Sequence, residues 1–201
     1  MPRGIVLSTA IVLGLAISAP AATLTVDLNG GADYTDIQSA IDAAADGDTI
    51  LVMPGEYVVT VPISYRGKGI TVRGESGPET TTIRMAEEPA DPQRGNVVRF
   101  ENGETSAAVL EGLKITGGKA KTRCSIDTVS AANCGGGVWC WNSCPTLVDC
   151  RITGNAVTCY GGGVACEGAA PTLMYCMISD NSAVSYADGG CGGGISCRGD
   201  S

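Results

Sequence analysis

The chain has 201 residues, enough for one domain with a sizeable core or for one domain preceded by a targeting segment. It contains no His, which excludes Ser-His-Asp triads, Cys-His proteases and His-ligated zinc sites. A net charge of -8 and 4% aromatic residues argue against nucleic-acid binding, because cations for phosphates and rings for base stacking are scarce. Since 44% of the residues are hydrophobic and only 17% are charged, the chain can bury surface and is expected to be globular.

The first 21 residues have the pattern of a secretory signal peptide. Arg3 precedes an apolar run over residues 5–17, and Ala19 and Ala21 occupy the two small-residue positions of a cleavage site. The run is shorter than the roughly 20 residues that a membrane-spanning helix needs. We therefore expect cleavage after Ala21, a single mature domain over residues 22–201 without a transmembrane segment, and a secreted or cell-surface location.

An amphipathic helix is predicted over residues 35–45. Thr35 and Gln38 have the spacing of a capping box, in which the two side chains satisfy each other's free backbone N–H groups. The apolar side chains that share one face of this helix are Ile37, Ala40, Ile41 and Ala44. Alternating segments at 49–57, 70–74 and 81–85 then predict strands. We interpret the helix as a cap that covers an open edge of the strands.

The C-terminal half repeats itself at an interval of 26 residues. GGGVWC at 135–140 returns as GGGVAC at 161–166, and PTLVDCRITGN at 145–155 returns as PTLMYCMISDN at 171–181. A third copy opens with GGGISC at 192–197, and a degenerate copy covers 98–100 and 108–118, with Leu113 in place of Cys. Apolar residues two or three positions apart indicate short strands. Stacked units of three such strands predict an all-β solenoid, the right-handed parallel β-helix, in preference to leucine-rich repeats or propeller blades.

The N-terminal residues resemble the opening of pectin-lyase-like right-handed β-helix proteins, pectin methylesterases among them. The similarity lies in DYTDIQSAIDAA at 33–44, GDTI at 47–50 and PGEY at 54–57. The glycine triplets and the C-x-I-x-x-N elements are similar to repeats of secreted bacterial β-helix proteins and, more loosely, of polymorphic outer-membrane autotransporters. The resemblance covers about residues 24–201 and implies the fold. It implies no particular activity, because one scaffold hosts lyases, hydrolases, esterases, adhesins and stalks.

The catalytic motifs of these families are missing from the chain. Polygalacturonase-like hydrolases carry Asn-Thr-Asp, Asp-Asp, Gly-His-Gly and Arg-Ile-Lys, of which only Arg151-Ile152 is present, and methylesterases carry Gly-Gln-Asp and Val-Asp-Phe. The arginine base of pectate lyases has one candidate, Arg151, but Met177 replaces it in the next coil, so we interpret Arg151 as a surface side chain. We assign no catalytic residue and expect binding rather than catalysis.

The expected function is therefore a structural, carbohydrate-binding or surface-binding module, with polysaccharide or a cell-surface component as partner and no nucleic acid. Two alternatives stay open. In the first, the chain is the N-terminal part of a polysaccharide lyase or glycoside hydrolase. In the second, it is a passenger segment of an autotransporter or adhesin. Because Ser201 falls immediately before an expected Pro-Thr-Leu strand, we expect the β-helix to continue in a longer protein.

No cofactor is expected, and calcium is the one metal for which the sequence offers candidate ligands. Residues 27–33 alternate oxygen-bearing side chains with other residues but lack a final bidentate Glu, and turn formation explains them equally well. The acidic residues of the Cys-rich half do not recur from coil to coil as a shared site would require; they are Asp149, Glu167, Asp180, Asp188 and Asp200. We assign no metal-ligating or cofactor-binding residue.

The ten cysteines fall into two sets of five. One set occupies repeat positions and is expected to form an inward ladder of buried, free thiols, because stacked in-register side chains point in parallel and make poor disulfides: Cys140, Cys166, Cys197, Cys150 and Cys176. The other set lies in loops, where an oxidising compartment favours pairing: Cys124, Cys134, Cys144, Cys159 and Cys191.

Other recurring residues are interpreted through the same coils. Asn155 and Asn181 predict a stacked ladder at left-handed corners, and the glycine triplets predict bends where chains approach closely. Trp139 is expected to face outwards, either as a stacking platform for a sugar ring or against the loop of residues 119–133. The remaining aromatics of this half are Trp141, Tyr160, Tyr175 and Tyr186. We interpret the Arg-Gly-Asp of residues 198–200 as a chance match in a variable turn.

Overall fold

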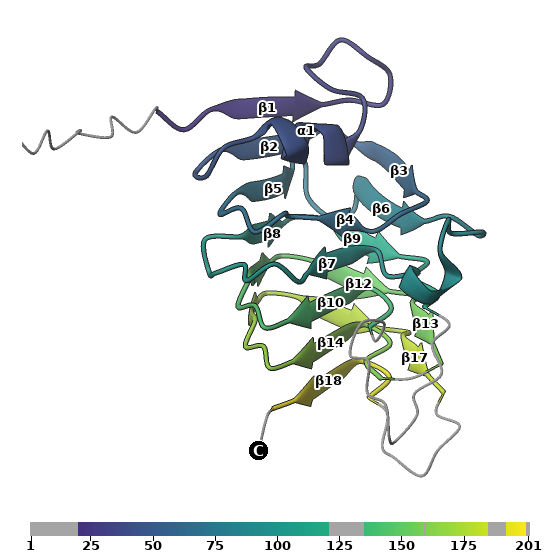
Figure 1. The fold of residues 1–201 in the computed structure, drawn as a ribbon. Coiled ribbons are helices and arrows are strands. Elements are labelled where there is room, and N and C mark those ends of the chain that lie inside the picture. Colours follow the sequence, from purple (N-terminus) through teal and green to yellow (C-terminus); the bar gives the residue numbers. More distant parts are fainter. Residues whose placement is uncertain (1–19, 121–134, 159, 185–191, 200–201) are drawn as a thin grey trace, which may run out of the picture.

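The computed structural model describes residues 20–120, 135–158, 160–184 and 192–199. The chain winds in coils that stack along one axis, and the strands of successive coils form three parallel sheets (Figure 1). Sheet 1 contains β1 (Thr23–Val26), β2 (Thr49–Val52), β5 (Thr71–Gly74), β8 (Val109–Glu111), β11 (Thr146–Val148) and β15 (Thr172–Met174). Sheet 2 contains β4 (Ile63–Ser64), β7 (Val98–Phe100), β10 (Val138–Trp141), β14 (Val164–Glu167) and β18 (Ile195–Arg198). Sheet 3 contains β3 (Gly55–Val59), β6 (Thr81–Met85), β9 (Lys114–Thr116), β12 (Arg151–Thr153) and β16 (Met177–Ser179).

The pairing of the strands confirms the predicted repeat. Leu147 lies opposite Leu173 and Val138 lies opposite Val164, so equivalent residues of successive coils stand 26 positions apart. Leu110 lies opposite Leu147, which places the degenerate copy directly before the regular ones. A small fourth sheet, of β13 (Ala156–Val157) and β17 (Ser182–Ala183), was not predicted.

The core is a set of columns of inward apolar side chains. In sheet 1, Ile50, Val72, Leu110 and Leu147 follow one another from coil to coil, and all are fully buried. Because side chains alternate along a strand, every second residue points into the core. A strand of three residues therefore contributes at least one core side chain to its coil. Each such side chain contributes about 1.5–3 kcal/mol on burial, and a single coil could not bury its own.

Helix α1 (Ile37–Ala43) lies across one end of the coil stack, between β1 and β2 in the chain (Figure 1). It packs against β1, β2 and β4, and the four predicted apolar residues are all buried: Ile37, Ala40, Ile41 and Ala44. The predicted cap is confirmed, but the predicted capping box is wrong. Asp36 is the N-cap, and its Oδ1 accepts a hydrogen bond from the Ser39 backbone N at 2.8 Å.

Gln38 does not take part in a capping box because its side-chain amide forms hydrogen bonds with the backbone of β4. Its Oε1 accepts from the Ser64 backbone N at 2.9 Å, and its Nε2 donates to the Ser64 carbonyl at 3.1 Å. Asp is at least as good an N-cap as Thr, so the helix begins one residue later than the sequence spacing indicated.

With Asp36 as the N-cap, substitutions at Asp36 and Thr35 should have unequal effects on stability. Asp36→Ala should lower the free energy of unfolding by about 1 kcal/mol, because a free helix N–H loses its acceptor. Thr35→Ala should change it by less than about 0.5 kcal/mol. Urea unfolding followed by circular dichroism measures both values, and a larger loss for Thr35→Ala would contradict the assigned cap.

The asparagine ladder is confirmed, although not at left-handed positions. Asn155 is buried; its Nδ2 donates to Asn181 Oδ1 at 2.9 Å, and its Oδ1 accepts from the Gly118 N at 2.9 Å. The left-handed residues stand one position earlier, at Gly154 (φ 66°) and Asp180 (φ 53°). The corner is therefore turned before each Asn, which leaves its side chain free to bridge the coils.

Several predictions fall outside the described residues. They concern residues 1–19 of the predicted signal peptide, most of the loop at 119–133, and Cys124, Cys134, Cys159 and Cys191. Ala22 already belongs to the fold, since its N donates to Asp48 Oδ1 at 2.7 Å and its carbonyl accepts from Thr49 N. No helix in the described part of the chain is long and apolar enough to cross a membrane.

Candidate functional site: a groove beside the capping helix

A groove of about 350 Å³ lies on the outer face of sheet 2 at β4 and β7. Helix α1 borders it on one side, and the segment with the short 3-10 helix η1 (Pro92–Arg94) borders it on the other. Its polar lining includes Gln38, Ser64, Arg66, Arg94, Arg99 and Glu101. The volume falls within the range of small-ligand sites.

Arg99 forms the floor of the groove. It stands in the middle of β7 between the inward Val98 and Phe100, so strand alternation directs it outwards, and yet its side chain is only 2% exposed. Its Nε and Nη2 donate to Glu101 Oε2 at 3.0 and 2.5 Å, and its Nη1 donates to Asn96 Oδ1 at 2.5 Å. The guanidinium is thereby held in one orientation.

Glu101 joins this buried arginine to a more exposed one. Its Oε1 accepts from Arg94 Nη2 at 2.5 Å, while Oε2 accepts from Arg99. Burial raises the pKa of Glu101, but the hydrogen bonds and positive charges of Arg99 and Arg94 outweigh it, and the net shift is downward. The carboxylate is therefore ionised at neutral pH and acts as a brace between two guanidinium groups.

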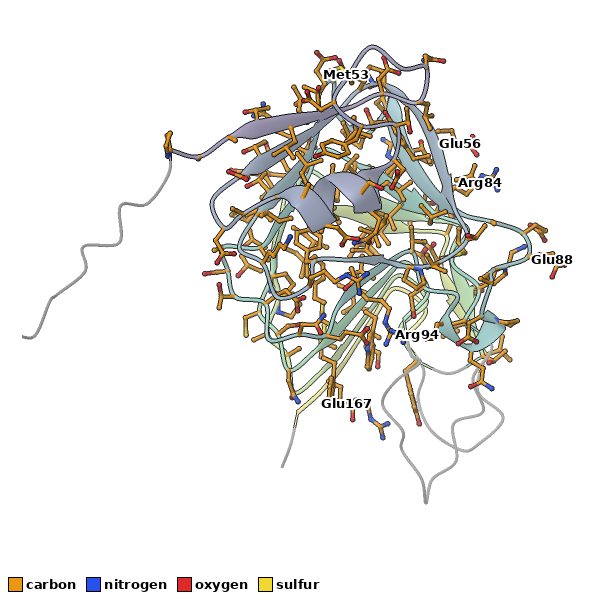
Figure 2. All side chains as sticks on the ribbon, turned by 45° about the horizontal axis from the view of Figure 1, so that its top comes forward. Met53, Glu56, Arg84, Glu88, Arg94 and Glu167 are labelled. Carbon is orange, nitrogen blue, oxygen red and sulfur yellow. The ribbon has the colours of Figure 1, made fainter. Side chains whose placement is uncertain are left out.

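Arg94 is the member of this trio that is best placed to meet a ligand. Its side chain is 47% exposed, against 22% for Glu101. Among the described residues, its guanidinium binds only Glu101, which leaves further N–H donors for a ligand. Figure 2 shows Arg94 well apart from Arg84 and Glu56, an exposed ion pair between β6 and β3. Val61 and Pro62 add an apolar wall to the groove.

Of the two alternatives for Trp139, the exposed stacking platform is wrong. Trp139 is 1% exposed and lies in register beside Arg99, and its Nε1 has no hydrogen-bond partner among the described residues. Alternation does place it on the outer face of sheet 2, but that face is covered here, since Arg99 and Ala165 are buried as well. A Cβ on Gly161 would lie 2.6 Å from Ala165 Cβ, so the glycine corner folds close over the strand. Trp141 is 42% exposed.

The other candidates from the sequence lie away from this groove. Arg151 forms an exposed ion pair with Glu79 at 2.6 Å, which agrees with a surface role. Asp33 accepts from the backbone N and Oγ1 of Thr25, and the backbone hydrogen bond, helped by the hydroxyl, lowers its pKa. Asp27 Oδ1 accepts from Asn29 N at 2.9 Å, so both carboxylates stabilise the turn. In the described ranges, no three Cys, Asp or Glu side chains converge as ligands for a metal ion.

The register of the thiol ladder is as predicted, but only three of its five members are buried, because Cys176 is half-buried and Cys197 is exposed. Cys140, Cys166 and Cys197 lie opposite one another on β10, β14 and β18, and the repeat equivalents Cys150 and Cys176 also face the core. All five are free thiols, as is the exposed Cys144 of the loop set.

Arg198 of the Arg-Gly-Asp sequence lies over the Tyr160 ring at 4.4 Å; Asp200 is outside the described residues.

Comparison with known proteins establishes the fold. No protein-family model and no curated protein matches the chain. Among solved structures, a pectin methylesterase mutant in complex with a hexasaccharide is similar with a TM-score of 0.52 and 13% identity, over 79% of this chain and 49% of that one. Pectin methylesterase from carrot is similar with a TM-score of 0.43 and 14% identity, over 78% of this chain and 65% of that one. The chain thus spans about half the length of the first match. It is a right-handed parallel β-helix with the pectin-lyase-like fold, as predicted.

Proposed function

We propose that this chain is a secreted or cell-surface β-helix module that binds carbohydrate in the groove between α1 and η1. The observation that carries the proposal is the braced trio of Arg94, Glu101 and Arg99, which fixes hydrogen-bond donors beside an apolar wall. Sites with fixed donors lose little entropy when a ligand binds. The similar pectin methylesterase, solved with a hexasaccharide, gives the ligand class to try first.

The groove suits an oligosaccharide that carries carboxylate groups. Guanidinium groups bind carboxylates through paired hydrogen bonds, and Arg94 has the exposure to do so. Pro62 and Val61 can meet the C–H face of a sugar ring. The lining residues carry three guanidinium groups, on Arg66, Arg94 and Arg99, against the carboxylates of Asp91 and Glu101.

We propose binding rather than hydrolysis or elimination at this groove. A general acid has to be protonated near neutral pH, whereas the pKa of Glu101 is lowered by its two arginines against the effect of burial. A lyase or hydrolase needs a catalytic acid or base that the trio does not supply.

Titration calorimetry with acidic and neutral oligosaccharides tests the proposal. We expect acidic oligosaccharides to bind and Arg94→Ala to weaken binding about tenfold or more, which is about 1.4 kcal/mol. The matched control is Arg84→Ala, because Arg84 is also a half-exposed arginine in an ion pair, but on sheet 3. Equal affinities for the two variants, or no binding of any sugar, would overturn the groove as a carbohydrate site.

A further inference from the structure

A second feature of the molecule, independent of the groove, is a column of thiols on sheet 2. Cys140 on β10, Cys166 on β14 and Cys197 on β18 occupy one inward position in successive coils. Cys140 and Cys166 are buried in the apolar core, and Cys197 is exposed. We call these three residues the thiol column.

The thiols of the column interact with one another. The thiol of Cys140 donates a hydrogen bond to Cys166, which lowers the pKa of Cys166 against the effect of burial, and Cys197 also bonds Cys166. The same interaction raises the pKa of Cys140. The other stacked pair, Cys150 and Cys176, shares this thiol–thiol interaction. Cys150 Sγ in addition lies within hydrogen-bond distance of the carbonyls of Leu110 at 3.3 Å and Val148 at 3.4 Å.

The spacing of the column fits two-coordinate binding of a metal ion. In-register residues of parallel strands stack about 4.7–4.9 Å apart. A thiolate binds a metal such as zinc at about 2.3 Å, so two such bonds in a line span about 4.6 Å. Sulfur atoms that follow the spacing of the strands would both reach an ion midway between them.

The arrangement selects against zinc and against the hard cations. Structural zinc requires four ligands in a tetrahedron, and calcium requires six or more oxygen atoms. Neither set is available to a straight column of sulfur atoms inside an apolar lumen. Soft thiolate ligands favour Cu(I), a monovalent ion that accepts two sulfur ligands in a line.

We propose that the thiol column is a site for soft monovalent cations, Cu(I) and its analogue Ag(I), held between Cys166 and its neighbours. On binding, the S–H bond of one thiol breaks, the sulfur forms a bond to the ion, and the proton leaves to solvent. The neighbouring sulfur donates a lone pair without losing its proton. The charge of the site is unchanged, because one monovalent cation replaces one proton, and no oxidant or reductant is needed.

Silver titration of the reduced full chain tests this inference, because Ag(I) does not change oxidation state under these conditions. After competition with excess glutathione, native mass spectrometry should find at least one more silver ion on the wild type than on Cys166→Ala. X-ray absorption at the silver edge should find two sulfur neighbours per retained ion. The protein should take up protons again when the silver is removed.

The matched control is Cys144→Ser, which removes an exposed free thiol outside the column and should keep the full number of ions. Equal retention by the wild type and Cys166→Ala, or an equal loss in Cys144→Ser, would overturn the inference. Circular dichroism establishes that Cys166→Ala is folded. Should it not fold, Cys197→Ser provides the second variant: it removes only the exposed end of the column and should retain the ion between Cys140 and Cys166.

Discussion

Gly137→Ala is expected to lower the free energy of unfolding by about 2–3 kcal/mol, whereas Gly194→Ala should lower it by less than about 0.5 kcal/mol. The two glycines occupy the same position in different copies of the triplet. A Cβ on Gly137 would lie 2.7 Å from the Gly163 carbonyl O and 2.7 Å from Ile152 Cγ2. On Gly194, the nearest atom to a Cβ is Ile178 Cγ2 at 3.8 Å. The first change forces adjacent coils apart, and the second fits.

Gly163→Ala provides the internal control for this comparison. Its added Cβ would meet the Gly194 carbonyl O at 2.6 Å, so it should behave like Gly137→Ala. Since alanine also restricts the unfolded chain, Gly194→Ala is free to be neutral or slightly stabilising. Denaturant unfolding of the three variants measures the effect. Equal losses at all three positions would show that backbone conformation, rather than the close approach of coils, determines the need for glycine.

Glu101→Gln is expected to cost about 2–3 kcal/mol, somewhat less than the roughly 3–5 kcal/mol for breaking a fully buried ion pair, because water reaches the groove. The substitution leaves Arg99 buried without its carboxylate, while the shape of the side chain is kept. The exposed pair of Arg84 and Glu56 is the control, and Glu56→Gln should cost less than about 0.5 kcal/mol. Thermal and urea unfolding of both variants provide the comparison.

The effect of Glu101→Gln should depend on pH in one direction. The folded protein holds the pKa of Glu101 below its value in the unfolded chain, which is about 4.3. The carboxylate therefore contributes its full stability above that pH and loses it as the pH falls through the folded pKa. The difference between wild type and variant should be constant from roughly pH 6 to roughly pH 8 and shrink in acid. A difference that grows in acid would contradict the role of Glu101 as an ionised brace.

The fold was predictable because its determinants are local and repeated. The 26-residue interval that separates Val138 from Val164 in the sequence is the register of β10 and β14 in the structure. The apolar face of α1 was equally visible. Its first residue was not, because Asp36 and Thr35 are both good caps, and the choice depends on Gln38 binding Ser64, a contact between segments 26 residues apart.

The groove was not predictable from the sequence. Gln38, Arg94 and Arg99 come from a helix, an irregular segment and a strand, and no spacing links them. One local signal was present: a charged residue between Val98 and Phe100, followed by Glu101 two positions later, indicates an outward arginine with a counter-charge on the same side of the strand. The burial of Trp139 on the outer face was not predictable for the same reason. Alternation fixes the side of the sheet, whereas burial depends on what covers that side.

The bond between Gln38 and β4 also affects how molecules can associate. Ser64 lies at the edge of sheet 2, and its backbone N–H and carbonyl would otherwise be open to a strand from another molecule. The Gln38 amide binds both groups, as a peptide group of a further strand would. The Gln38 side chain thus takes the place of a neighbouring strand at Ser64. Association of two molecules through this sheet edge would first have to displace the Gln38 amide.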